Sequence, residues 1–472
     1  MKNKIIIVIL FLAPTLFARE MGDFVKDIKI APFYFSIPAF VSEKLSDGTE
    51  ILALPNSEFP IIYSELHIYH GKKDLGKRPV EIIRLLEDSW EFSGSKSYPK
   101  DTLLQEFENL GANFSLSIGY HKTVIGFSYL KKDEARVFEL FQSFWKESVL
   151  DDEVISTMRG RISEEIKRRN DNPSAVGGRK SQELLFSNTI QGTSSTIQGL
   201  GGIKKEDLVE FQKEILSEKK RVLILSGDVN VSSWKKNLSS LEVYSSAPKA
   251  GSEEITTESL KQSLTNTKNK NILVDKDVSQ SFVIMMGVLP KHNDPDFYSI
   301  QVLNYIIGGG GFNSYFMREI RNNRGLAYSA GSSADFQDEY GVINFFAMTK
   351  TESVPEVVSL MKELIDSKFI DTIKEEELLR AKVAITNQFV FLFDDSKKVL
   401  NNDLRFKEHH MPKEYLVNFR ENIEKVSLLD IRRVGKLYFN PEKLATVVVG
   451  PKSLKQGLGE KFQVISPEDR IP

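Results

Sequence analysis

The chain has no cysteine among its 472 residues. This absence excludes disulfide bonds and metal sites built on thiolates. It also excludes the lipid-modified cysteine of bacterial lipoproteins. A chain of this length can bury a hydrophobic core large enough to do without disulfides, so the absence is compatible with export.

A strong excess of charge of one sign is also missing. The sequence has 63 basic and 65 acidic residues, which gives a formal net charge of −2. Proteins that bind nucleic acid as their main partner usually carry a clear basic excess. We therefore expect no nucleic acid among the partners.

Long apolar runs are absent after the N-terminus. The one candidate, residues 5–12, follows the positive Lys2 and Lys4 and precedes a small residue, Ala18. This run is too short for a confident membrane span, and the pattern is typical of a signal peptide at residues 1–18. We expect a periplasmic or otherwise exported protein, with an uncleaved anchor as the alternative.

The order of expected elements occurs twice along the chain. Each half begins with strands, continues with two helices, two alternating strands and further helices, and ends in a buried strand followed by Gly227 or Gly450. These glycines lie 223 residues apart, about half of the chain. The repeat predicts an α+β fold with two homologous halves, residues 19–238 and 272–472, each a mostly antiparallel sheet packed with helices. Residues 239–271 are rich in Ser, Thr, Lys and Glu and have the composition of a linker.

Residues 306–331, IIGGGGFNSYFMREIRNNRGLAYSAG, contain four consecutive glycines. A phosphate-binding loop is excluded, because an apolar helix precedes the glycines and no lysine follows at the required position. We expect the glycines to provide a sharp turn between two helices, with Asn313 or Ser314 capping the second.

The two-half layout and this segment resemble the pitrilysin/insulinase-like metallopeptidases, also called inverzincins. The resemblance covers essentially the whole chain after residue 18 and implies a clamshell of two halves around a cavity. Its most specific motif is the following set: Gly308, Gly309, Gly310, Gly311, Phe312, Ser314, Arg318, Glu319, Arg321, Arg324, Gly325, Leu326, Ala327 and Tyr328.

The zinc motif of that family, H-x-x-E-H, is missing. The best alignment places Arg84 and Asp88 at the two histidine positions and Glu87 at the position of the general base, while Glu165 falls at the distal ligand position. A guanidinium has no lone pair for zinc, so we expect no metal in this chain. Arg84 and Asp88, one helical turn apart, can pair instead. The alternatives are a solvated charged face and, less favoured, an atypical metal site.

Arg324 and Tyr328 remain intact. The resemblance implies that members without the zinc motif work beside a catalytic homologue that carries H-x-x-E-H and zinc, and that an Arg/Tyr pair reaches toward an extended peptide substrate at the partner's site. The opposite interpretation pairs Arg324 with Glu319 and leaves Tyr328 as a half-buried strand residue. Two functions follow: the non-catalytic subunit of a heteromeric metallopeptidase, or an envelope scaffold without a proteolytic role. A homodimer remains open.

Overall fold

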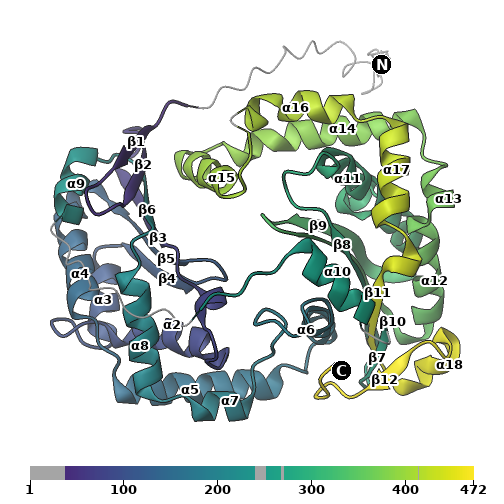
Figure 1. Cartoon of the computed structure of the whole chain (residues 1–472), viewed down its shortest axis with the longest axis horizontal. Coiled ribbons are helices and arrows are strands. Elements are labelled where there is room, and N and C mark those ends of the chain that lie inside the picture. Colours follow the sequence, from purple (N-terminus) through teal and green to yellow (C-terminus); the bar gives the residue numbers. More distant parts are fainter. Residues whose placement is uncertain (1–37, 240–250, 267–269, 413, 472) are drawn as a thin grey trace, which may run out of the picture. The chain divides into compact units, whose positions relative to one another are not determined.

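The computed structural model describes residues 38–239, 251–266, 270–412 and 414–471 (Figure 1). The expected signal peptide lies outside these residues. Within them, no helix is long and apolar enough to cross a membrane.

Two six-stranded sheets form the framework. The first has the order β1-β2-β6-β3-β5-β4 and the second β12-β7-β11-β8-β10-β9. The strands are β1 Val41–Lys44, β2 Glu50–Pro55, β3 Ile61–Ile68, β4 Asn113–Ile118, β5 Thr123–Leu130, β6 Arg221–Gly227, β7 Asn271–Asp275, β8 Gln280–Leu289, β9 Ala327–Phe336, β10 Gly341–Lys350, β11 Ala445–Gly450 and β12 Gln463–Ile465.

The predicted repeat is confirmed at the level of topology. Five strands of each sheet follow the same order, with β2, β6, β3, β5 and β4 matching β7, β11, β8, β10 and β9. The β2–β6 and β7–β11 pairs are parallel, and the other pairs among these strands are antiparallel. The α+β class and the mostly antiparallel sheets are therefore also confirmed. The clamshell arrangement of the two halves stays a prediction.

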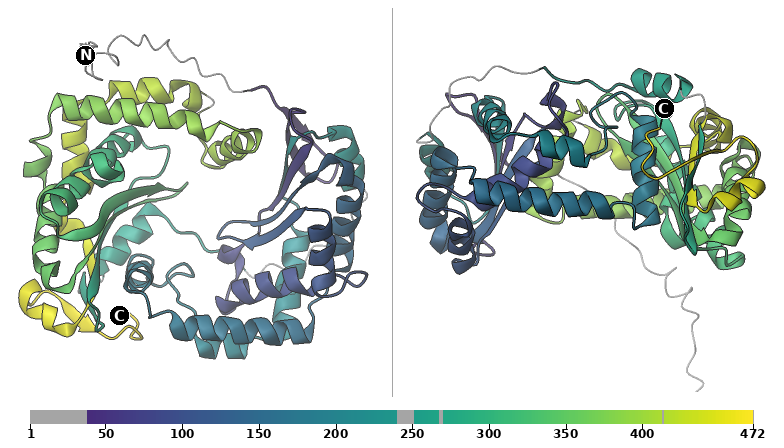
Figure 2. Two further views of the ribbon diagram at one scale, coloured as in Figure 1. Left: turned by 180° about the vertical axis from the view of Figure 1, so that it is seen from behind. Right: turned by 90° about the horizontal axis from the view of Figure 1, so that it is seen from below.

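The helices in chain order are α2 Glu81–Ser93, α3 Asp101–Asn109, α4 Glu134–Glu147, α5 Asp152–Arg168, α6 Pro173–Leu185, α7 Ile197–Gly202, α8 Lys205–Ser217, α9 Val231–Ser239, α10 Thr257–Asn266, α11 Phe297–Asn304, α12 Val354–Ile365, α13 Ser367–Ile370, α14 Glu375–Phe389, α15 Ser396–Glu408, α16 Tyr415–Lys425, α17 Leu428–Tyr438 and α18 Lys455–Leu458. Figure 2 shows them in two further views.

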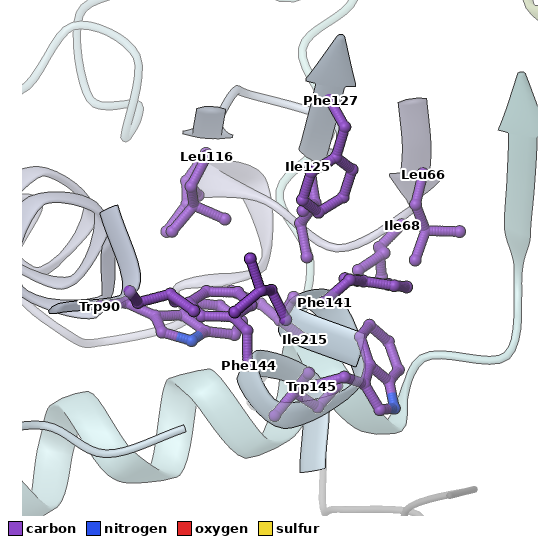
Figure 3. Close-up of a cluster of buried hydrophobic side chains, with 14 of the residues drawn as sticks. Leu66, Ile68, Trp90, Leu116, Ile125, Phe127, Phe141, Phe144, Trp145 and Ile215 are labelled. Atoms are coloured by element: carbon purple, nitrogen blue, oxygen red, sulfur yellow. The ribbon is translucent and has the colours of Figure 1, made fainter. Parts of the chain in front are cut away.

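One face of the first sheet carries the largest core. Helices α2, α3, α4 and α8 place their apolar sides on it, and the aromatic rings concentrate around Phe144 (Figure 3). Trp90 of α2 stacks on Phe144 with ring centroids 5.6 Å apart. Burial of such large side chains contributes about 2–3 kcal/mol each, so this core fixes α2 firmly against the sheet.

The two halves exchange a helix. Helix α6, from the first half, packs on β8 and β11 of the second sheet, and α15, from the second half, packs on β6 and β2 of the first. The two helices are each 13 residues long, and both their ends differ by the same 223 residues that separate Gly227 from Gly450. Figure 1 shows α15 beside β2 and β6. The exchange is therefore part of the internal repeat.

Part of the expected linker has a regular structure. Residues 257–266 form α10, whose Leu260 and Leu264 are buried against α6 and β8. The low apolar content of residues 239–271 still leaves two leucines one helical turn apart, which is enough for a short amphipathic helix.

Candidate functional site

Helix α2 carries Arg84, Glu87 and Asp88, the residues that the resemblance aligns with the zinc motif. Trp90, Leu86 and Ile82 face the core, so the helix turns Arg84, Glu87 and its neighbours toward the other side. The periodicity of α2 thus places the altered motif at the surface between α2, the end of β4 and helix α5, with which α2 makes close contact.

Arg84 holds both acidic residues of the altered motif. Its Nε lies 3.0 Å from Asp88 Oδ2, and its Nη1 donates to Glu87 Oε1 at 3.3 Å. The Asp88 side chain is almost completely buried, whereas Arg84 is about half exposed. The expected pairing of Arg84 with Asp88 is confirmed, and an unneutralised buried carboxylate is avoided.

Glu87 points to the edge of the first sheet. Its Oε2 accepts a hydrogen bond of 2.7 Å from the backbone N–H of Ile118, the last residue of the edge strand β4. Burial raises the pKa of Glu87, against the effects of this bond and of Arg84. The carboxylate therefore lies beside backbone groups at which an extended peptide could add to the sheet.

Glu165 lies on α5 and faces a guanidinium of its own helix. Arg161, one turn earlier on the same helix, approaches Glu165 Oε1 at 3.5 Å. Burial also raises the pKa of Asp88, with Arg84 and Arg161 opposing the rise. Arg161 was not identified from the sequence, although its i,i+4 spacing to Glu165 is the signal that would have found it.

Glu91 is a second residue that sequence reasoning missed. Burial, followed by the nearby Asp88 and Glu87 carboxylates, raises the pKa of Glu91 to about 7. A carboxyl group that titrates near neutrality is suited to proton transfer, but it also arises wherever acidic residues crowd on one helix face. Its position one turn beyond Glu87 was visible in the sequence.

The residues present at this site do not fit zinc. A guanidinium stands where one imidazole would have to be, and it bridges two of the remaining carboxylates. Within the described residues, no group of three or more His, Asp or Glu side chains is arranged to hold a metal ion. His67 and His70, the nearest histidines in sequence, are buried in and just after β3.

The glycine segment of the second half has an unusual backbone. Helix α11 continues into a π-helix, Tyr305–Gly309, and a second π-helix covers Phe316–Asn323. The helices expected here are present, but their turns contain more residues than those of an α-helix, and such turns are frequent at functional sites. Ser314 caps the second one by accepting from Met317 N at 3.4 Å, as expected for one of the two candidate caps.

The glycines serve two purposes. Gly311 has a φ of +57° and makes the turn. Gly308 instead allows close packing, because a Cβ there would lie 2.5 Å from Ser332 Oγ of β9. Gly308 therefore packs closely against the middle of β9, which is the strand that carries Tyr328.

Arg324 and Tyr328 are both accessible. Tyr328 is 75% exposed at the start of the edge strand β9. Arg324 is about half exposed and lies 3.9 Å from Glu356 of α12, not beside Glu319. Glu319 pairs instead with Arg318 at 3.2 Å. The interpretation of a half-buried tyrosine and an Arg324–Glu319 pair is wrong.

Two further side chains surround this pair. The Arg321 guanidinium lies 5.5 Å from the centroid of the Tyr328 ring and 5.4 Å from that of Phe312. Phe312 is 68% exposed. The Arg321 guanidinium lies between the two rings, and the cation–π contacts restrict the movement of both rings. The start of β9 therefore carries a preformed aromatic surface.

Comparisons with known proteins agree with this arrangement. A sequence model described as "Insulinase (Peptidase family M16)" matches residues 87–197, and one described as "Peptidase M16 inactive domain" matches residues 202–385. An uncharacterized zinc protease of Rickettsia felis is 24% identical over 376 residues, covering 77% of this chain and 86% of that protein.

Two other similarities extend over more of the chain. The non-peptidase homolog YmxG of Helicobacter pylori is 22% identical over 427 residues, covering 86% of this chain and 96% of that protein. A solved structure of a peptidase M16 inactive domain from Pseudomonas fluorescens matches with a TM-score of 0.74 at 18% identity, covering 88% of this chain and 98% of that one. The fold is the same in both halves.

Proposed function

Because this chain belongs to peptidase family M16, as a homologue of the inactive type, we propose that it is the non-catalytic, substrate-binding subunit of an exported heteromeric zinc metallopeptidase. Its partner is a homologue that carries H-x-x-E-H and the zinc. The substrate is an extended peptide. The one observation that carries the proposal is the contrast between the two sites: a salt bridge replaces the metal ligands on α2, while Arg324 and Tyr328 stay exposed on β9.

The second-half pair has a chemistry suited to this role. A guanidinium and a phenol both donate hydrogen bonds, and donors of this kind stabilise a peptide carbonyl oxygen as it gains negative charge. Their exposure leaves them free to reach a substrate held by a partner chain. An Arg and a Tyr with only a structural role would be expected to bury their polar groups against this chain.

The edge strand β4 supports binding of the peptide backbone. It borders the first sheet on one side only, so its outer N–H and C=O groups can pair with an added strand. Such pairing depends on the backbone and gives affinity for many sequences.

An envelope scaffold without proteolytic function is the alternative. The same exposed aromatic surface, Phe312 and Tyr328 around Arg321, would then bind another protein permanently. Exposed aromatic and arginine side chains are enriched at protein interfaces generally, which is why this alternative deserves a test.

The test is reconstitution. This chain and an H-x-x-E-H homologue from the same genome are purified separately and together, and peptide cleavage, complex formation and zinc content are measured. We expect a stable complex, zinc only in the partner, and at least tenfold more cleavage in the complex than in the partner alone. A complex with unchanged cleavage would favour the scaffold, and stoichiometric zinc in this chain would overturn the assignment of α2.

A further inference from the structure

A large pocket lies where α15 meets the first sheet. Its volume is about 990 Å³, and its walls come from β1, β2, β3, the start of β6, the β4–β5 and β9–β10 turns, and residues 401–410. We call it the histidine pocket. It is separate from the altered zinc motif on α2 and from Tyr328, none of whose residues line it.

Histidines concentrate at this pocket. The whole chain has six histidines, and four of them, His67, His121, His409 and His410, line it. His292 packs against His409 with ring centroids 4.9 Å apart. These histidines come from distant parts of the sequence, so only the docking of α15 on the first sheet brings them together.

The pocket has more cations than carboxylates. Its lining includes the following cationic side chains: Lys44, Lys73, Lys122, Lys220, Arg221, Arg405 and Lys407. The carboxylates are Glu50, Asp338 and Glu408.

Each of the three carboxylates is already engaged. Asp338 Oδ1 lies 2.7 Å from His409 Nδ1, and Glu408 Oε1 lies 2.8 Å from Lys122 Nζ. Glu50 lies 3.9 Å from Lys407. The acidic groups thus neutralise part of the wall, and Lys73 pairs with Asp74 at 2.9 Å. Within the described residues, Lys44 and Lys220 are among the lining cations that no ion pair neutralises.

Lys220 is one of these remaining cations. Its Nζ lies 4.1 Å from the centroid of the Tyr69 ring, and Lys122 Nζ lies 5.8 Å from the same centroid. The ammonium groups of Lys220 and Lys44 have no carboxylate within 4 Å among the residues that the structure describes. Lys122 is already paired with Glu408, so the Lys220 ammonium is the cation over this ring that a flexible anionic side chain can reach.

His67 adds a buried polar group without a hydrogen bond. The residue is 4% exposed, and in the described part of the chain neither ring nitrogen has a hydrogen-bond partner. Its Nε2 lies 3.6 Å from Glu65 Oε2, which is within ion-pair distance but longer than a hydrogen bond. A buried polar group without a hydrogen bond destabilises the fold unless a ligand or a water molecule supplies that hydrogen bond.

Burial and nearby charges both act on the neighbouring histidines. Burial lowers the pKa of His121, and Lys73 and Lys122 lower it further, whereas Asp338 and Glu408 raise it. Burial likewise lowers the pKa of His292 to about 4, assisted by His409 and Arg405 and opposed by Asp338.

The lining also suits a peptide backbone. The side-chain N–H₂ of Asn401 donates to Glu65, and the side-chain N–H₂ of Asn402 donates to the Leu392 carbonyl. Both amides keep a side-chain oxygen that can accept from a peptide N–H. A phosphate group offers no such donor when it is fully ionised, so the mixture of cations and acceptors favours a polypeptide over a phosphate compound.

We propose that the histidine pocket binds an acidic segment of a polypeptide substrate, with Lys44 and Lys220 pairing with its carboxylates and His67 donating to one of them. The inference rests on the proposed peptide-binding function and adds a substrate class, chains with clustered Asp or Glu. The net charge of −2 for the whole chain makes general attraction of acidic peptides to its surface an insufficient explanation.

The test compares two labelled peptides of equal length on the full chain by fluorescence anisotropy. One contains four consecutive glutamates, and in the other they are replaced by glutamines. We expect the acidic peptide to bind at least tenfold more tightly at 50 mM salt, and this advantage to shrink at 300 mM salt.

Variants locate the binding. The double substitution Lys44→Gln, Lys220→Gln should weaken the binding of the acidic peptide about tenfold and leave the binding of the glutamine peptide unchanged. Both lysines are exposed, so the fold should persist, which circular dichroism verifies. The matched control is Lys261→Gln, Lys425→Gln, two exposed lysines on α10 and α16 that should change neither affinity.

The outcomes separate the two proposals. Equal binding of both peptides, or no effect of the lysine pair, would overturn the inference and leave the peptide-binding function intact. Binding of neither peptide would contradict the peptide-binding function as well. Tripolyphosphate that binds more tightly than the acidic peptide and displaces it would reassign the pocket to phosphate compounds.

Discussion

Arg84 Nε lies 3.0 Å from Asp88 Oδ2, one turn along α2. At this spacing two imidazoles would face the same side of a helix, and here a cation and an anion occupy those positions and neutralise each other. The helix thus carries an ion pair at the two positions that the resemblance assigns to metal ligands.

Replacing Arg84 should make stability depend on pH. Without the guanidinium, the buried Asp88 carboxylate loses its partner and its pKa in the folded state rises further above 3.8. The variant therefore keeps its stability at low pH, where Asp88 is protonated, and loses it as pH rises. We expect Arg84→Ala to lower the free energy of unfolding by about 1–3 kcal/mol at pH 8 and by less at pH 5. Urea unfolding at both pH values measures this. Arg380→Ala on α14 is the control, and equal losses at both pH values would contradict the buried pair.

Neutralising Glu91 should stabilise the protein above neutral pH. Its pKa is 4.5 when unfolded and about 7 when folded, so the wild-type protein loses stability as pH rises through this window. Glu91→Gln removes that loss. Because the side chain is only partly buried, we expect a gain of about 1 kcal/mol at pH 8 and none at pH 4.5. The exposed Glu376→Gln serves for comparison, and a Glu91 variant no more stable than wild type at pH 8 would refute the assignment.

Glu65 should stabilise the docking of α15. Burial would raise its pKa, but His67, Lys397 and Asn401 lower it to about 2. Lys397 Nζ lies 2.8 Å and Asn401 Nδ2 2.9 Å from its two oxygens.

The contribution of Glu65 is present above pH 4.5 and is lost as pH falls toward 2. Glu65→Gln should therefore cost about 2 kcal/mol at pH 7 and clearly less at pH 3, by urea unfolding. Glu421→Gln, in an exposed pair on α16, should change stability by less than about 0.5 kcal/mol. A loss that does not depend on pH would show that the ion pair is not the cause.

Gly308 should not tolerate a side chain. An added Cβ would lie 2.5 Å from Ser332 Oγ and 2.6 Å from Ser332 N, which belong to β9. We expect Gly308→Ala to lower stability by about 1–3 kcal/mol. Gly160→Ala, at an exposed position of α5 with open space around it, should instead raise stability by about 0.5–1 kcal/mol. Thermal unfolding distinguishes the two, and a neutral Gly308→Ala would mean that β9 can shift.

Arg324 and Tyr328 should matter only in the complex. Arg324→Ala and Tyr328→Phe should each reduce peptide cleavage by the reconstituted complex about 10–1000-fold, because each removes a donor to the reacting carbonyl. Assembly and the stability of this chain should not change, since both side chains are exposed. Arg420→Ala and Tyr63→Phe are matched controls. Full activity of both Arg324 and Tyr328 variants would favour the scaffold.

The sequence was informative where local rules act. Periodic patterns located α2 and the strands, and a repeat of 223 residues was readable from Gly227 and Gly450. The pairing of Arg84 with Asp88 followed from helical spacing alone. The exposure of Tyr328 could not be predicted from the sequence, because the same alternating pattern fits both a buried and an open sheet edge.

By itself, the sequence determined the two α+β halves, the loss of the zinc motif and the retention of Arg324 and Tyr328, since these depend on residue type and short spacing. The tertiary structure alone decided the exchange of α6 and α15 between the halves and the gathering of His67, His121 and His409 at one pocket. Such contacts join residues hundreds of positions apart. Their partners are selected by the packing of whole surfaces, which no local pattern encodes.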